Sequence, residues 1–404
     1  MKYILAFSTL LFAQIGHATN VYKFTASYPE NTQVAASTRE LALSGAKIID
    51  SIPQLGIYVT ETPVTLNSRN FLDLGEVKTI SLITPNEDSR AKQPWGLTAI
   101  HANEAWTIST GAGVVVAVSD TGVDSNHPDL EKSMWRNPGE MGTDANGNDK
   151  TSNGIDDDNN GYVDDVFGWN FVKNKPSGKD NHYHGTHVSG TIAAQPTKKL
   201  SGVAPDAKIM DVSFLGGSGS GSEINGAKTI IYAADNGAKI INCSWGDAGK
   251  NQIIQDAILY AQQKGVLVVV AAGNSKLNTD RKPFFPSSID LDNIVSVGAT
   301  SGIKHTKASF SNYGATTVDV AAPGYKIYST APTSNKTPRY KTLSGTSMAS
   351  PHVAGVAALL WSANPGFNWQ QVKDRLLETT QPSKYWKKKN LTEGAIDAYA
   401  AVKK

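Results

Sequence analysis

Short apolar runs alternate with helix-forming stretches from residue 111 onward, and this alternation limits the folds that the chain can adopt. Helices are predicted at roughly residues 223–236, 251–264 and 349–362, and strands at residues 114–119, 207–213, 239–243, 266–271 and 294–297. The first and fourth strands are nearly continuous in β-branched residues, which is typical of strands covered on both faces. The pattern therefore predicts an α/β fold with a mostly parallel sheet and helices on both of its faces.

Two polar residues, Asp120 and Asn274, stand where predicted strands have just ended. Active sites of open α/β sheets gather at the carboxyl ends of the strands. Ser347 precedes an apolar stretch that is predicted to be helical, with Pro351 expected in its first turn. Backbone N–H groups at such a helix start favour developing negative charge. These positions are therefore candidates for a reaction centre.

Asp120, His184 and Ser347 together offer an acid, a base and a nucleophile. A serine hydroxyl is a poor nucleophile at neutral pH and needs a histidine to accept its proton. The histidine in turn needs a carboxylate that holds its tautomer and stabilises the imidazolium. Taken singly, Ser347 could be a helix cap, Asp120 a turn aspartate and Asn274 a left-handed turn residue. Their combination favours nucleophilic catalysis, with Asn274 donating an amide N–H to the oxyanion.

Three clustered histidines, His182, His184 and His187, allow a different chemistry, because histidines can bind zinc. The metalloprotease helix pattern needs histidines four residues apart and a glutamate beside the first. Here the spacing from His184 to His187 is three, and Gly185 takes the glutamate position. His184 is therefore the predicted base, and His182 and His187 are predicted to be structural or exposed. A metal-dependent hydrolase and an inactive binding module on the same fold remain the alternatives.

Several of these segments carry a resemblance to the subtilisin family of serine peptidases, from about Pro94 to the C-terminus. They are residues 120–124, 127–130, 184–190, 270–274, 345–352 and 394–400. The resemblance implies an endopeptidase that cuts protein and peptide substrates through an acyl-enzyme on Ser347. It also implies that residues 19–90 are a small α+β pro-domain that assists folding, then inhibits the enzyme until removed. Residues 91–404 would form the peptidase domain. The mature chain is expected to begin between about residues 84 and 94, within a polar, proline-flanked linker.

The resemblance also places a substrate groove on several glycine-rich segments. An exposed edge that pairs with extended substrate is expected at Gly219, Ser220 and Gly221, although a flexible loop is the alternative. The primary specificity pocket is expected between two walls, formed by Ser244, Trp245 and Gly246 on one side and Gly273 on the other. No carboxylate is placed to select lysine or arginine. We therefore expect broad specificity, with a preference for apolar or aromatic residues before the cut.

An acidic insert, which holds residues 144–149 and 153–165, lengthens the separation of Asp120 and His184 to 184 − 120 = 64 residues. Oxygen ligands at alternate positions before a glycine are what a calcium-binding turn requires. Phe167 takes the usual glutamate position, and a solvated acidic loop is the alternative. The loop at residues 195–200 departs from the family's calcium-holding loop, so no ion is expected there. A structural calcium ion is expected in the insert, on Asp156, Asp158, Asn160 and Asp165.

The first 18 residues read as an export signal, with Lys2, an apolar run from Tyr3 to Ala13 and small residues before Thr19. The enzyme is expected to be secreted, extracellular or periplasmic, without a membrane anchor. The single cysteine, Cys243, excludes an intramolecular disulfide and is expected to be a small buried residue. Charged residues make up 18% of the chain and the net charge is +2, so no nucleic-acid partner is expected.

Overall fold

The computed structural model describes residues 19–25, 30–61, 64, 70–83, 86–87, 95–197, 200–335 and 337–403. The expected signal peptide, residues 1–18, lies outside the described residues. The chain divides into two compact units, Met1–Val77 and Lys78–Lys404. The segment at residues 78–90, which the sequence analysis groups with the pro-domain, thus falls in the second unit.

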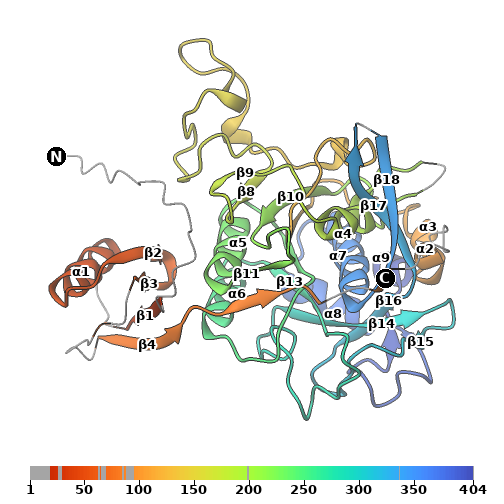
Figure 1. The fold of residues 1–404 in the computed structure, drawn as a ribbon. Helices are drawn as coiled ribbons and strands as arrows, with labels where there is room; N and C mark the ends of the chain where they lie inside the picture. The colour runs from red at the N-terminus through yellow and green to blue at the C-terminus, as the bar shows by residue number, and fades with distance from the viewer. Residues whose placement is uncertain are drawn as a thin grey trace. The chain divides into compact units, whose positions relative to one another are not determined.

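The first unit is a small antiparallel sheet with one helix (Figure 1). Its sheet has the order β2-β3-β1-β4. A cluster of Phe24, Leu41 and Tyr58 forms its centre, and Phe71 packs against this cluster. The elements are β1 (Asn20–Phe24), α1 (Glu30–Leu43), β2 (Ile48–Ile52), β3 (Ile57–Thr60) and β4 (Phe71–Glu76).

The second unit is built on a mostly parallel sheet with the order β19-β20-β16-β14-β13-β12-β7-β10-β8-β9, and β15 pairs with β14. Antiparallel pairs occur only at β8–β9, β14–β15 and β19–β20 within the described part of this sheet. Its strands are β7 (Val115–Asp120), β8 (Gly168–Asn170), β9 (Lys175–Pro176), β10 (Lys208–Ser213), β12 (Ile240–Cys243), β13 (Leu267–Ala271), β14 (Ile294–Ser301), β15 (Thr306–Lys307), β16 (Val320–Pro323), β19 (Gln381–Pro382) and β20 (Gly394–Ala395). The expected fold class is confirmed.

Helices cover both faces of this sheet, as two neighbouring residues of β7 show. Val118 belongs to the core cluster that includes residues of α4 and α7, whereas the Ser119 hydroxyl bonds Thr229 of α5 at 2.7 Å. Successive residues of a strand point to opposite faces. The helices are α2 (Trp95–Ala99), α3 (Ala102–Ala105), α4 (His184–Ala193), α5 (Glu223–Asp235), α6 (Gln252–Gln263), α7 (Thr346–Ala363), α8 (Trp369–Glu378) and α9 (Ala398–Lys403).

Three further pairs of strands border the large sheet. β11 (Ser220–Ser222) pairs with β5 (Thr79–Ser81), and β18 (Thr337–Ser344) pairs with both β17 (Ile327–Ser334) and β6 (Asn86–Glu87). These additions join residues 79–81 and residues 86–87 to the peptidase unit at two places. Both places lie beside the carboxyl end of the sheet, because β11 follows β10 and β18 leads into α7.

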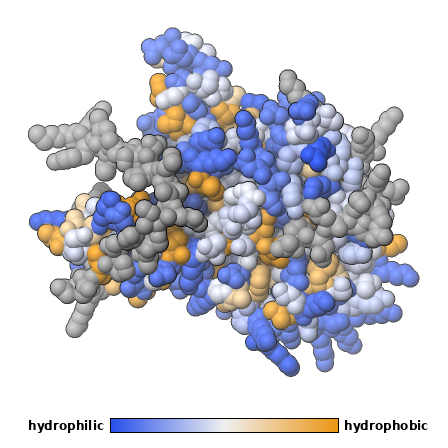
Figure 2. Space-filling view, viewed as in Figure 1, coloured by the Kyte–Doolittle hydropathy of each residue, from blue (hydrophilic) through white to orange (hydrophobic). Residues whose placement is uncertain are grey.

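Apolar side chains are concentrated in the interior of the second unit. On the face shown in Figure 2, the hydrophobic side chains are scattered among hydrophilic ones. Ile155 and Val163, in the acidic insert, are among the exposed large hydrophobic residues. No helix in the described part of the chain is long and apolar enough to cross a membrane.

The prediction for α7 is wrong in one detail. The helix begins at Thr346 rather than near residue 349, so Pro351 lies inside it and not in its first turn. A proline inside a helix removes one backbone hydrogen bond, here the bond that residue 351 would donate to the carbonyl of Ser347. Packing compensates for this loss, since every residue from Thr346 to Trp361 is buried.

Candidate active site

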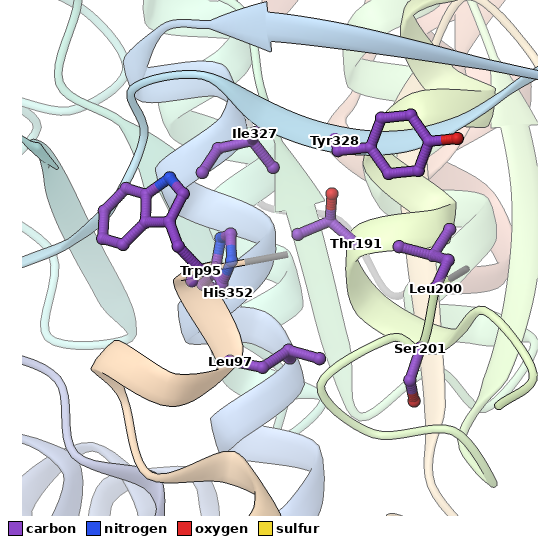
Figure 3. A pocket seen from close by; sticks show the side chains of 9 residues that line it. Trp95, Leu97, Thr191, Leu200, Ser201, Ile327, Tyr328 and His352 are labelled. Atoms are coloured by element: carbon purple, nitrogen blue, oxygen red, sulfur yellow. The ribbon is translucent and has the colours of Figure 1, made fainter. Parts of the chain in front are cut away.

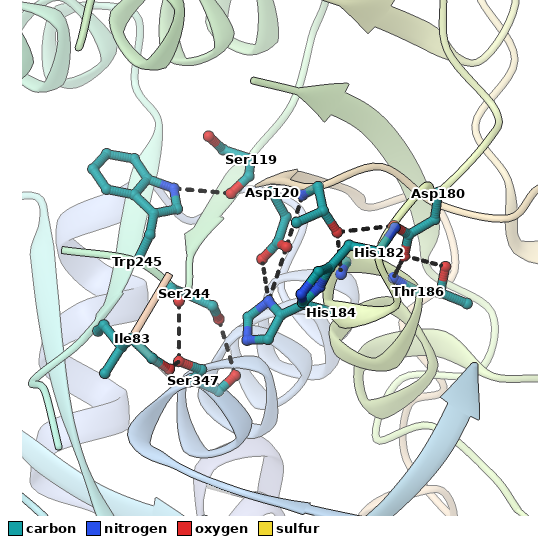
Figure 4. Close-up of polar contacts among 12 residues, drawn as sticks. Ile83, Ser119, Asp120, Asp180, His182, His184, Thr186, Ser244, Trp245 and Ser347 are labelled. Atoms are coloured by element: carbon teal, nitrogen blue, oxygen red, sulfur yellow. Dashed lines mark hydrogen bonds and ion pairs between the residues drawn. The ribbon is translucent and has the colours of Figure 1, made fainter. Parts of the chain in front are cut away.

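Asp120 and His184 form a buried pair at the carboxyl end of β7 (Figure 4). The Nδ1 atom of His184 lies 2.8 Å and 2.9 Å from the two carboxylate oxygens of Asp120, and both residues have no exposed surface. This bond places the Nδ1 proton toward Asp120 and leaves Nε2 unprotonated in the neutral ring. His184 Nε2 has no hydrogen-bond partner among the described residues. The ring is therefore held as an acceptor at Nε2.

The position of Gly185, next to His184, has no room for a side chain. A Cβ atom at this position would lie 2.2 Å from the carbonyl oxygen of Gly122, in the loop that follows Asp120. The Gly185 N–H donates to Thr121 Oγ1 at 3.0 Å, which links the same two segments. The loop after β7 and the start of α4 thus approach each other closely, which brings Asp120 to His184.

Ser347 lies in the first turn of α7, fully buried next to His184 (Figure 4). Its Oγ lies 3.0 Å from the carbonyl oxygen of Ser244 and 3.3 Å from that of Ile83. Ser244 follows β12, so the carboxyl ends of β7 and β12 and the starts of α4 and α7 meet here. The structure brings Asp120, His184 and Ser347 together although they are far apart in sequence.

Asn274 lies beside this group with its amide held in one orientation. Its Oδ1 accepts hydrogen bonds from the backbone N–H and the hydroxyl of Thr346, at 2.9 Å and 3.0 Å. With Oδ1 bound to the residue before Ser347, the Nδ2 group is the end that can donate toward a reacting carbonyl. Thr346 was not predicted from sequence, and only its position beside Ser347 could have suggested it.

Residues 79–83 run through the groove as an extended strand. β5 pairs antiparallel with β11, with Ser81 opposite Ser220 and Ile80 opposite Gly221. The Leu82 N–H donates to the carbonyl of Gly219 at 2.8 Å. On its other side the strand forms a bridge between Leu82 and Trp245. The predicted edge at Gly219, Ser220 and Gly221 therefore pairs with an extended segment of the chain itself.

A second short pairing joins residues 86–87 to β18. Asn86 lies opposite Ser344 and Glu87 opposite Leu343, in the strand that leads directly into α7. The backbone thus approaches Ser347 along β11 up to Ile83 and reaches β18 at Asn86.

The two predicted pocket walls converge on one aromatic ring. A Cβ atom on Gly246 would lie 2.6 Å from the ring of Phe284, and one on Gly273 would lie 3.1 Å from it. β12 and β13 are paired up to Cys243 and Val270, so these walls are their continuations. The Phe284 ring therefore occupies space between the two walls, a feature that the sequence analysis missed.

Trp245 is the residue expected to add apolar surface to that pocket. Its indole is buried, donates to the carbonyl of Ser119 at 2.9 Å and contacts the ring of Phe214 edge-on. With Gly246, Ile80, Ile254 and other residues it lines a pocket beside the strand of residues 78–80.

The three histidines do not share a site. His187 is buried, and its Nε2 lies 3.1 Å and 3.2 Å from the carbonyl oxygens of Ile327 and Lys341. Burial lowers the pKa of His187 to about 3, so the ring is neutral at physiological pH. His182 stacks on the ring of Tyr183. With His184 held by Asp120, these contacts do not support a metal-dependent hydrolase.

A further buried histidine, His352, lies away from the reacting group on α7. Its Nδ1 lies 2.8 Å from the carbonyl oxygen of Met348, and burial lowers its pKa to about 4. It lines a small pocket with Trp95, Tyr328 and Leu200, among others (Figure 3). None of the residues lining this pocket was expected to take part in catalysis.

Two carboxylates near the pair, the half-buried Asp180 and the buried Asp211, were also missed. Asp180 accepts hydrogen bonds from the hydroxyls of Thr121 and Thr186, and burial raises its pKa to about 6. Asp211 accepts from the N–H groups of Val123 and Gly178, and burial raises its pKa to about 7. Both tie the loop after Asp120 to the segment before His184. An isolated aspartate in a strand gives no sequence signal for such a role.

The acidic insert folds around a carboxylate that was not predicted. Glu140, Asp156 and Asp158 bring ligand oxygens within 4.8 Å of one another. Glu140 has no exposed surface; its Oε1 accepts from the Asp157 N–H at 2.9 Å, and its Oε2 has no hydrogen-bond partner among the described residues. Burial and neighbouring carboxylates raise the pKa of Glu140.

Asn160 and Asp165 are the other two expected ligands. Asn160 Oδ1 accepts from the Tyr162 N–H at 2.8 Å. The Asp165 carboxylate accepts from Asn137, Asn160 and the Tyr232 hydroxyl. Asp156 and Asp158 belong to the carboxylate cluster, whereas Asp165 is not a member of it. Asn160 lies beside the cluster, because its N–H donates to both carboxylates and its side-chain amide donates to Asp158.

Cys243 is buried at the end of β12, and burial raises the pKa of its thiol. A neutral, enclosed thiol is a poor nucleophile. This agrees with a packing role.

Comparison with known proteins supports one family. Residues 111–399 match the sequence model of the Subtilase family. Thermitase from Thermoactinomyces vulgaris is 38% identical over 325 residues, which is 79% of this chain and 99% of thermitase. Subtilisin Savinase from Lederbergia lenta is 38% identical over 288 residues, which is 71% of this chain and 90% of that protein.

A solved structure supports the same fold. Fervidolysin from Fervidobacterium pennivorans, a keratinolytic enzyme related to subtilisin, superposes with a TM-score of 0.71 and 25% sequence identity. The match covers 98% of this chain but 62% of the fervidolysin chain, so fervidolysin contains additional regions.

Proposed function

This chain is a subtilisin-like serine endopeptidase of the subtilase family, and we propose that it matures by cutting its own Ile83–Thr84 bond. One observation carries the proposal: the carbonyl oxygen of Ile83 lies 3.3 Å from Ser347 Oγ at the end of a strand paired with the groove. A backbone held in this way is the expected position of a scissile bond. Residues 19–83 are then the pro-domain and its inhibitory strand, and the mature enzyme begins at Thr84.

The roles of the catalytic residues follow from their contacts. Ser347 Oγ attacks the Ile83 carbonyl carbon while its proton passes to Nε2 of His184. Asp120 holds the opposite face of the ring and stabilises the imidazolium. Asn274 Nδ2 donates to the oxyanion that forms on the carbonyl oxygen.

Bond cleavage completes the cycle. The C–N bond breaks, the new amine of residue 84 takes the proton from His184, and water then hydrolyses the acyl-enzyme on Ser347. The same steps apply to any polypeptide that lies in the groove as residues 79–83 do.

We propose broad specificity with a preference for apolar side chains before the cut, narrowed toward aliphatic ones. The Phe284 ring fills space between Gly246 and Gly273, so a large aromatic side chain would meet it. Ile83, at the proposed cleavage position, is an aliphatic residue with 7% of its surface exposed. The proposal thus keeps the apolar part of the earlier expectation and leaves out large aromatic residues.

We further propose that the acidic insert binds one calcium ion on Glu140, Asp156 and Asp158. The ligand set consists of carboxylate oxygens, which calcium prefers. The buried, unpartnered Glu140 Oε2 fits a cation better than an empty solvated loop, because an unpaired buried carboxylate oxygen is costly. The ion would be structural and would take no part in peptide cleavage.

We also propose that residues 1–18 direct export of the protein.

One experiment tests both the serine mechanism and the proposed maturation bond. It compares the intact masses of wild type and Ser347→Ala before and after treatment with a fluorophosphonate probe, alongside casein hydrolysis. Wild type should lose residues 1–83, label once and digest casein, whereas Ser347→Ala should retain residue 83 joined to residue 84. A mature N-terminus other than Thr84 would refute the proposed bond, and wild type that is folded and processed but unlabelled would refute the serine mechanism.

A further inference from the structure

We infer that Glu223 recognises the main chain of the substrate six residues before the cut, extending the groove beyond the strand pairing of β11. This inference rests on the proposed cleavage after Ile83, which makes Lys78 the sixth residue upstream. The Glu223 Oε1 atom accepts the Lys78 N–H at 2.9 Å, and the Glu223 N–H donates to the Lys78 carbonyl at 2.9 Å. Both polar backbone groups of Lys78 are therefore bound by one residue.

The strand register explains why a side chain is needed at this position. Leu82 and Gly219 exchange a hydrogen bond in the antiparallel ladder, and the Glu223 N–H to Lys78 bond continues the same register four residues on. In such a ladder the facing main-chain carbonyl would accept the Lys78 N–H. Glu223, however, is the first residue of α5, where its carbonyl points along the helix. The Glu223 carboxylate therefore accepts the Lys78 N–H in place of the Glu223 main-chain carbonyl.

The carboxylate is held in place before any peptide arrives. Glu223 is 3% exposed, and its Oε2 accepts a hydrogen bond from the Asn251 side chain. Asn251 is itself anchored, because its Oδ1 accepts the Ile254 N–H at the start of α6 at 3.0 Å. Among the described residues, the Glu223 Oε1 atom accepts a hydrogen bond only from the Lys78 N–H. Once the inhibitory strand leaves, this buried and oriented oxygen loses that partner. A substrate that supplies an N–H at the same point restores the bond.

The ligand class is thus an extended polypeptide with at least six residues before the cut and a free N–H at the sixth. Proline at this position, which has no N–H, is disfavoured. The Lys78 ammonium donates to the carbonyl oxygen of Lys250 at 3.3 Å, and its positive charge interacts favourably with the Glu223 carboxylate. Glu223 therefore favours long, unfolded chains over short peptides, and its negative charge favours a cationic side chain at the sixth position.

The test uses an acetylated, amidated peptide with the sequence of residues 76–87, in three forms: unmodified, N-methylated at Lys78 and N-methylated at Val77. With mature wild type, methylation at Lys78 should lower kcat/KM roughly tenfold or more, because it removes a hydrogen bond to a charged acceptor. Methylation at Val77 should change kcat/KM by less than about twofold, since no groove contact is lost. In Glu223→Ala the Lys78 effect should vanish, and in Asn251→Ala it should shrink.

A matched control is Glu131→Gln, which alters an exposed carboxylate and should keep the wild-type ratio of rates. Fluorophosphonate labelling verifies that each variant has a formed active site. Equal rates for the Lys78-methylated and unmodified peptides, or a methylation effect that persists in Glu223→Ala, would overturn the inference. If casein is digested but the peptide is not cut after Ile83, the proposed maturation bond fails instead. The Lys78 effect is then measured as competition by the methylated and unmodified peptides against fluorophosphonate labelling.

Discussion

The hydroxyl of Ser244 donates a 3.0 Å hydrogen bond to the main-chain carbonyl oxygen of Ser347. This oxygen is the acceptor that Pro351 leaves without its helical N–H partner. In the reverse direction, the Ser347 hydroxyl lies 3.0 Å from the Ser244 carbonyl oxygen. Asn242 supports the arrangement by donating to Ser244 Oγ at 2.9 Å. The end of β12 thus fixes the first turn of α7, and with it the position of the reacting oxygen.

Replacing Ser244 by alanine is therefore expected to destabilise the protein by about 1–3 kcal/mol, the cost of an unsatisfied buried acceptor. Guanidinium unfolding of Ser244→Ala in a Ser347→Ala background, which prevents self-digestion, measures this change. Ser218→Ala, at an exposed serine, is the control and should unfold as the parent does. A Ser244→Ala midpoint equal to that of the control would contradict the role of this hydrogen bond.

Asp120→Asn is expected to lower kcat by roughly a thousandfold or more without unfolding the protein, because the amide favours the wrong tautomer of His184. The measurement is kcat on a peptide substrate, with circular dichroism to verify the fold. The variant should need an added processing protease, since self-cleavage also slows. Normal turnover by Asp120→Asn would remove Asp120 from the mechanism.

Phe284→Gly is expected to enlarge the primary pocket. Cleavage after phenylalanine should rise relative to cleavage after isoleucine by roughly tenfold or more, the gain from burying a large apolar side chain. A peptide series that varies only the residue before the cut measures the ratio. Phe284→Tyr keeps the ring and should keep the wild-type preference; a Phe284→Gly profile equal to wild type would show that the ring does not limit the pocket.

Asp211 makes stability depend on pH. Its pKa rises from 3.8 to about 7 on folding, so the native state binds more protons than the unfolded state between these values. This contribution to stability is present at low pH and is lost as pH rises through this window. Asp211→Asn removes this pH-dependent contribution. The stability of the variant relative to the parent should therefore increase from pH 4 to pH 7, and the difference should stay constant above pH 7. Denaturant unfolding of both proteins in the Ser347→Ala background at pH 4.5, 6 and 8 measures the difference, and parallel curves would argue against an ionisable Asp211.

Calcium is expected to raise the midpoint of thermal unfolding of chelator-treated protein, because an ion that binds only the folded state stabilises it. Glu140→Gln should lose most of this shift, since it removes a charged ligand. Asp290→Asn alters an exposed carboxylate outside the insert and should retain it. Calorimetric titration without detectable binding to wild type would leave the insert as a solvated loop.

The strands and helices that place the site were predictable because their signals are local. Runs such as residues 114–119 and 266–271 gave β7 and β13 to within one residue at each end. The start of α7 was misplaced, since its first turn is stabilised by β12 and by burial rather than by its own sequence. Asp156 and Asp158 were predicted from alternate spacing, but Glu140 comes from a separate turn and has no spacing to reveal it.

By itself, the sequence determined the chemistry available to this protein: which residues can act as nucleophile, base, acid and oxyanion donor, and that they follow strands and begin helices. Only the tertiary structure decided what surrounds them. The decisive contacts join segments that are distant in sequence: Ile83 contacts Ser347, Phe284 lies between two glycines, and Glu223 binds Lys78. Motifs record the groups that react, whereas close packing of remote elements sets which peptide reaches them, and such packing leaves no periodic trace along the chain.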